Sequence, residues 1–153
     1  MSANTPLVLI TPEAREALEL EAERAGIGGD LVGGLLFGYP VDERRRLVVY
    51  SVRPRPEVGF GQKGFSLDQS RTSQQLAAAR KLASQADYCG VWYLHRTPDP
   101  ELTDDEWVQA QGVLEDPDFR FKDLVCLVLC LYSGDLNTYA FSVSYTHLRA
   151  HET

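Results

Sequence analysis

The sequence predicts one α/β domain, in which a mixed sheet of about seven strands packs against two to three helices. Apolar runs of strand length alternate along the chain with segments that repeat apolar residues at helical spacing. The expected element order is β-α-β-β-β-α-β-α-β-β, which is typical of a mixed sheet. The 153 residues suit a single domain with a core of its own.

The first half of the chain predicts a strand, a helix and a hairpin. Thr11 is an expected N-cap because a proline and an acidic residue follow it. The glycines of the GGLLFG segment indicate a bulge or a close approach of two backbones. The expected elements are a strand over 7–10, a helix from Thr11 to Arg24, a strand over 33–38, a turn over 39–43 and a strand over 46–52.

The second half predicts strands and helices in alternation, followed by two strands. The segment LVCLVLCLY has almost no polar residue, so we expect a central strand that is buried on both faces. The expected elements are a loop over 53–64, a strand over 65–68, a helix over 72–85, a strand over 88–94, a helix over 104–115, and strands over 124–132 and 136–143.

Composition excludes several classes of protein. Fifteen basic and 22 acidic residues give a net charge of −7, which disfavours binding to nucleic acid. No segment reaches the ~20 apolar residues of a membrane span, and the N-terminus is unlike a signal peptide. Cys89, Cys126 and Cys130 lie in apolar runs without a CxxC pair, which favours buried, reduced thiols in a cytoplasmic protein over a reactive or metal-bound thiol.

The last ten residues, SYTHLRAHET, break the pattern and resemble translated adapter sequence that ends unrelated chains. We therefore expect a domain over 1–143 and a non-native or disordered tail over 144–153. His147 and His151 are spaced i, i+4, so a helical tail would alternatively place both on one face, where they would share a metal. Without the tail, His95 is the one imidazole of the body.

The segment most informative about chemistry is GVWYLHR, which ends an expected strand at His95. Eight residues later Thr103 opens a helix, and Glu106 lies three residues beyond it. This arrangement resembles the MPN domain, also called the JAMM domain, of metal-dependent isopeptidases and their inactive relatives. GGLLFG resembles that family's Gly-Leu-Leu-x-Gly strand, GVWYLHR its His-x-His-Pro strand, and LTDDE its Ser-x-x-Asp helix start. The resemblance covers about residues 7–143 and implies a three-layer, cytidine-deaminase-like fold.

In active members of the family, two histidines and an aspartate bind zinc, and a serine stabilises the oxyanion. By resemblance the first histidine is Tyr93 here, the second is His95, the serine is Thr103 and the aspartate is Glu106. A catalytic zinc site normally has three protein ligands and one open position. Tyr93 is a poor ligand because the pKa of a phenol is near 10.

The family's general base is a glutamate just before the Gly-Leu-Leu strand, and by resemblance this position is Leu31. An aliphatic side chain cannot accept a proton. Asp30 is adjacent, but on a strand it would point to the opposite face unless a bulge shifts it. The proline after the second histidine is replaced by Arg96.

The same residues have structural explanations. Thr103 and Glu106 fit a capping box, and His95 fits a hydrogen bond or ion pair with a carboxylate. Trp92 and Leu94 alternate with Tyr93 and are expected core residues. The acidic cluster near His95 is either a solvated loop or an oxygen-rich site for Mg²⁺ or Mn²⁺; its members are Asp99, Glu101, Asp104, Asp105 and Glu106.

We therefore assign no catalytic residue and no metal ligand, and we expect no cofactor. The favoured hypothesis is a degenerate MPN-like interaction or regulatory module. Its implied partner is another MPN-like chain, a second copy of itself or a ubiquitin-like protein. A cleft beside Trp92, Tyr93 and the edge of the Gly-rich strand would take an extended peptide. The alternatives are a divergent zinc (iso)peptidase that uses His95 and Glu106, with Asp105 as a further ligand, and a small-molecule binder.

Overall fold

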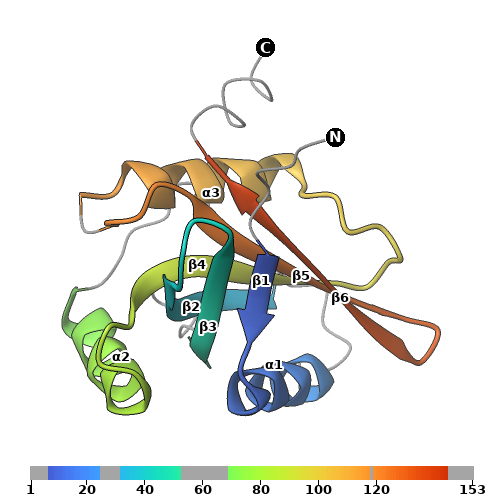
Figure 1. Ribbon diagram of the computed structural model, residues 1–153. Coiled ribbons are helices and arrows are strands. Elements are labelled where there is room, and N and C mark those ends of the chain that lie inside the picture. Colours follow the sequence, from blue (N-terminus) through green and yellow to red (C-terminus); the bar gives the residue numbers. More distant parts are fainter. Residues whose placement is uncertain (1–6, 25–31, 53–68, 118, 145–153) are drawn as a thin grey trace.

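The computed structural model describes residues 7–24, 32–52, 69–117 and 119–144. The expected α/β architecture is confirmed, with three helices and a six-stranded sheet in this part of the chain (Figure 1). The elements are β1 (Leu7–Ile10), α1 (Pro12–Arg24), β2 (Val32–Pro40), β3 (Arg45–Val52), α2 (Gln69–Leu82), β4 (Asp87–His95), α3 (Asp104–Glu115), β5 (Leu124–Tyr132) and β6 (Asp135–Val143).

The sheet is mixed, as the sequence predicts, and its strand order is β1-β3-β2-β4-β5-β6. The pairs β1–β3 and β4–β5 are parallel, and the other neighbours are antiparallel. The two outer strands approach each other, so the sheet curves into a nearly closed barrel. The expected seventh strand over 65–68 and the loop over 53–64 lie outside the described residues.

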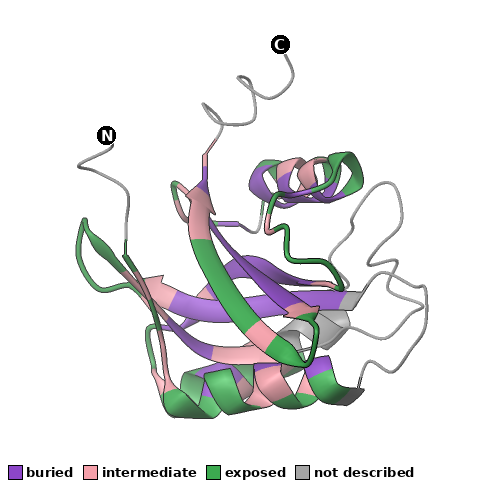
Figure 2. Ribbon diagram, turned by 90° about the vertical axis from the view of Figure 1, so that its right-hand side faces the viewer, coloured by how far each residue is buried: buried purple, intermediate pink, exposed green. Residues whose placement is uncertain are grey.

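Helices cover both faces of the sheet. Ala14, Leu18 and Ala22 of α1 are buried in a cluster on one face. Ala79 of α2 and Val113 of α3 belong to the cluster on the other face. Figure 1 shows the sheet between α3 above it and α1 below it, and Figure 2 shows buried residues concentrated where the helices meet the strands. No helix in the described ranges is long and apolar enough to span a bilayer.

The first seven residues of β5 are buried, and the strand lies between β4 and β6. The expected strand with both faces covered is therefore confirmed. An ion pair between Arg46 of β3 and Asp123, just before β5, links distant parts of the chain, with Nε 3.2 Å from Oδ1. Both side chains are mostly buried, which distinguishes this pair from the exposed pairs of the surface.

Two predicted boundaries are wrong. The turn predicted over 39–43 begins too early, because Tyr39 and Pro40 still pair with Leu47 and Arg46 of β3. The second helix begins and ends three residues before the predicted 72–85. It ends at Leu82 because the chain must turn into β4, and Arg80 Nε donates to the carbonyl of Ala86 across that turn, at 3.1 Å.

The glycines of β2 and β4 allow two backbones to approach closely. The register of β2 against β3 shifts between Phe37 and Gly38, so the predicted bulge is confirmed. A Cβ atom on Gly38 would overlap the carbonyl of Leu47, and one on Gly90 would overlap that of Val125. These carbonyls belong to neighbouring strands and cannot rotate away.

We expect Gly90→Ala to lower the free energy of unfolding by about 3 kcal/mol, because β4 and β5 would have to separate. Gly134→Ala is the control, since its site has a φ of +80° but nothing within 4 Å, and it should cost only about 1 kcal/mol. Urea denaturation measures both. Equal losses for the two variants would contradict the close approach at Gly90.

Candidate functional site

The candidate site joins the end of β4 to the start of α3. His95 is the last residue of β4, and Glu106 lies in the first turn of α3. His95 Nε2 is 2.8 Å from Oε1 of Glu106 and 3.0 Å from Oε2. The side chain of His95 is 10% exposed and that of Glu106 is 1% exposed. The sequence prediction that His95 pairs with a carboxylate is therefore confirmed.

Both ring nitrogens of His95 face hydrogen-bond acceptors. Nδ1 is 2.8 Å from the carbonyl oxygen of Asp99, which can only accept. Nε2 faces the carboxylate of Glu106. An imidazole that donates from both nitrogens carries two protons and a positive charge. The hydrogen bond that His95 donates to the carboxylate of Glu106 raises the pKa of His95 above its ordinary value, which agrees with this geometry.

A capping box positions Glu106, as the sequence predicts. Thr103 Oγ1 accepts from the backbone N–H of Glu106 at 3.2 Å, and Glu106 Oε1 accepts from the N–H of Thr103 at 2.9 Å. The carboxylate of Glu106 thus accepts hydrogen bonds both from the N-terminal end of α3 and from His95. Because the carboxylate is buried, these donors replace the water that it loses on folding.

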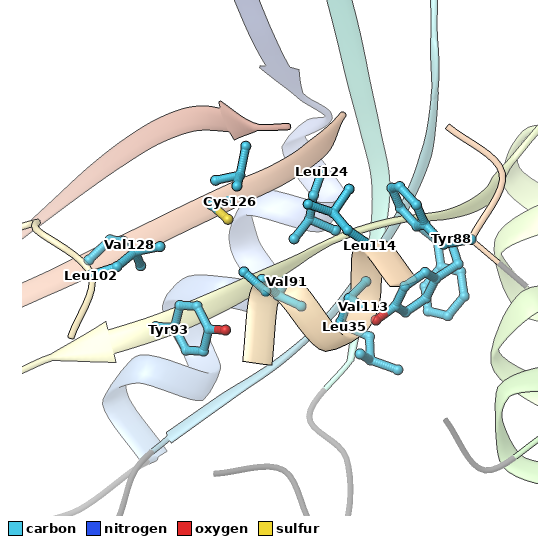
Figure 3. Close-up of a cluster of buried hydrophobic side chains, with 14 of the residues drawn as sticks. Leu35, Tyr88, Val91, Tyr93, Leu102, Val113, Leu114, Leu124, Cys126 and Val128 are labelled. Carbon is cyan, nitrogen blue, oxygen red and sulfur yellow. The ribbon is translucent and has the colours of Figure 1, made fainter. Parts of the chain in front are cut away.

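Tyr93 lies on the same side of β4 as His95 but inside the core, where it is 2% exposed. Figure 3 shows its ring between Leu102 and Val91. Its hydroxyl donates to the backbone carbonyl of Glu106 at 3.3 Å. Burial raises the pKa of this phenol well above 10, so it is protonated at neutral pH. Trp92 and Leu94 are buried on the opposite face, as predicted.

The acidic cluster separates into one buried residue and four exposed ones. Glu106 is buried against His95, whereas the other four carboxylates lie at the surface. Asp99 contributes its backbone carbonyl, not its carboxylate, to His95. In the described part of the chain, no three side chains of His, Cys, Asp or Glu gather closely enough to hold a metal ion, so Asp105 does not join His95 and Glu106.

Other expected site residues lie outside the described ranges, namely Asp30, Leu31, His147 and His151. The three cysteines are buried and free, as predicted. Burial raises the pKa of each thiol, which disfavours the reactive thiolate.

The suggested peptide cleft at the Gly-rich strand is wrong. β2 pairs with β3 on one side and with β4 on the other, so it has no free edge. Trp92 and Tyr93 are buried and cannot line an open cleft. The outer strands of the described sheet are instead β1 and β6.

Sequence reasoning missed Gln109 of α3, which is 1% exposed. Its amide nitrogen and oxygen have no hydrogen-bond partner among the described residues. The only sequence signal is its position three residues after Glu106, which places both side chains on one helix face.

The fold and site together define an α/β domain with a buried imidazolium–carboxylate pair at the junction of a strand and a helix. No family model and no curated protein matches the chain. Among solved structures, it is similar to the solution structure of protein DSY2949 from Desulfitobacterium hafniense, a structural genomics target. The TM-score is 0.60 at 18% identity, over 92% of this chain and 86% of the other. This likeness establishes a shared fold.

We expect the ring of His95 to titrate with a midpoint above 6.5, because Glu106 favours the charged form. The stability that this adds is complete below pH 6.5 and is lost as the pH rises through the higher pKa of the folded state. NMR titration of the imidazole measures the midpoint, and Glu106→Gln should lower it. A midpoint at or below 6.5 in the unaltered chain would refute the charged pair.

We also expect Glu106→Ala to lower the free energy of unfolding by about 3 kcal/mol, because it breaks the buried pair with His95 and leaves the N–H of Thr103 without its acceptor. Thr103→Ala should cost only about 1 kcal/mol, since it removes one cap hydrogen bond. A double-mutant cycle with His95→Ala isolates the pair. Additive losses in that cycle would show that His95 and Glu106 do not interact.

Proposed function

We propose that this chain is a catalytically degenerate MPN/JAMM-like domain that acts as a protein-interaction or regulatory module, linked to the handling of ubiquitin-like proteins. The element order and the motif positions support the assignment to this family. GGLLFG lies on β2, GVWYLH on β4 and LTDDE at the start of α3, in the order that the resemblance implies.

The proposal rests on the hydrogen bonding and protonation of the His95 ring. A histidine binds zinc through the lone pair of a neutral ring nitrogen. In this site each ring nitrogen faces an acceptor, so neither lone pair is available. Protonation and metal binding compete for the same atom, and the buried carboxylate of Glu106 favours the proton.

The remaining donors do not fit a catalytic zinc ion. Tyr93 is a protonated phenol that donates to the backbone of Glu106. His95 and Glu106 provide two donors at most, whereas catalytic zinc sites in proteins have three. The general-base position is an aliphatic residue, Leu31. These donors do not support metal-dependent hydrolysis, and a module that binds other proteins is the function that the site supports best.

We expect the purified chain with His147→Ala and His151→Ala to hold well under one equivalent of zinc. These two substitutions remove the histidines of the tail, which would bind metal on their own. The same chain with Tyr93→His and Glu106→Asp added restores the family's ligand types at the matching positions and should gain zinc. Elemental analysis after dialysis against a weak chelator measures both, and circular dichroism checks that the variants fold.

A stoichiometric zinc ion that His95→Ala removes would overturn the degenerate-module proposal in favour of a divergent metal-dependent peptidase. If the rebuilt variant folds and gains no zinc, the positional match to the family fails. As a matched control, Tyr93→Phe keeps the ring in the core, adds no ligand and should leave the zinc content unchanged.

A further inference from the structure

A groove of about 600 Å³ lies between the loop that precedes α3 and the last strand. Asp99, Glu101 and Leu102 of the loop line one side, Trp107 comes from α3, and Tyr139 and Phe141 come from β6. The volume is in the range of sites that bind small ligands, so an arginine side chain fits within it. Asp99 and Glu101 belong to the acidic cluster noted in the sequence, but no motif predicts that they lie beside β6.

The lining of the groove is mostly apolar, and its charged residues are all acidic. Asp99 and Glu101 contribute two carboxylates, and the lining residues within the described chain include neither lysine nor arginine. The Asp99 side chain accepts from the N–H of Glu101 at 2.9 Å, which gives this part of the loop a defined turn. The loop is also attached to the core, because the carbonyl of Asp99 is bound by His95.

Aromatic side chains line the same groove as the carboxylates. Trp107 and Phe141 are half-buried, and Tyr139 is 40% exposed. Aromatic faces attract cations through the negative charge of the ring face, and arginine both stacks on rings and binds carboxylates in two-pronged fashion. A guanidinium group therefore matches the carboxylates and the rings of this lining, whereas the carboxylates would repel an acidic side chain.

We propose that the groove binds an arginine side chain in an exposed, basic segment of a partner protein. The inference rests on the proposed function, because it gives the chemistry of the partner that the module recognises. The partner's positive charge complements both the groove and the net charge of −7. Residues beside the arginine pack on the exposed part of Tyr139.

The test uses the full chain and two fluorescent heptapeptides. One has a central arginine between leucine and serine residues, and the other has citrulline, which keeps the shape of arginine but not its charge. Fluorescence polarisation measures binding. We expect the arginine peptide to bind about tenfold more tightly, since one cation–π contact with ion pairing is worth roughly 1.4 kcal/mol. Added salt should reduce the difference.

Matched variants locate the binding. Glu101→Gln should weaken the arginine peptide about threefold and leave the citrulline peptide unchanged. Tyr139→Ala should weaken the arginine peptide about fivefold. The controls are Glu115→Gln, at the far end of α3, and Tyr132→Ala, which is 52% exposed beside the β5–β6 turn. Neither control residue lines the groove, and both variants should bind like the unaltered chain.

Equal affinity for the two peptides would overturn the proposal, as would equal effects of Glu101→Gln and Glu115→Gln. A dimer in analytical ultracentrifugation that Tyr139→Ala dissociates would also overturn it, by assigning the groove to a second copy. These outcomes are separate from the metal measurement. Stoichiometric zinc refutes the degenerate module, whereas loss of the arginine preference refutes only the identity of its partner.

Discussion

The contact between His95 and Glu106 connects three parts of the molecule. It joins the end of β4 to the first turn of α3, and through the carbonyl of Asp99 it also attaches the loop between them. A buried charge pair rarely stabilises a fold more than apolar side chains of similar size would, but removing one member of the pair lowers the stability strongly. The pair therefore attaches α3 and its loop to the end of β4.

The same contact relates the resemblance to the proposed function. A strand that ends in histidine meets a helix whose first turn carries a carboxylate, but no third ligand side chain lies beside them among the described residues. Tyr93, which the proposed assignment would place at a ligand position, is a buried phenol, and the carboxylate of Glu106 contacts the imidazole directly. The imidazole and the carboxylate are thus paired with each other, and the groove that we propose as the binding surface lies elsewhere, between α3 and β6.

The sequence predicted those parts of the fold that depend on local patterns. The N-caps at Thr11 and Thr103, the apolar run of β5 and the bulge at Gly38 all follow from side-chain types at fixed spacing. The sequence-based prediction failed where pairing between residues far apart in the chain decides the local structure. Tyr39 and Pro40 look like a turn but are held in the sheet by β3. The groove was beyond sequence reasoning because β6 and the loop before α3 are brought together only by the fold.

The accessibility of the three thiols reports which face of the sheet becomes exposed when part of the protein unfolds. Cys89 lies in the cluster covered by α1, whereas Cys126 and Cys130 lie in the cluster on the face covered by α2 and α3. All are buried, so an alkylating reagent reaches a thiol only after the covering helix detaches or the sheet separates. The order in which the three cysteines become labelled therefore distinguishes a local opening on one face from complete unfolding.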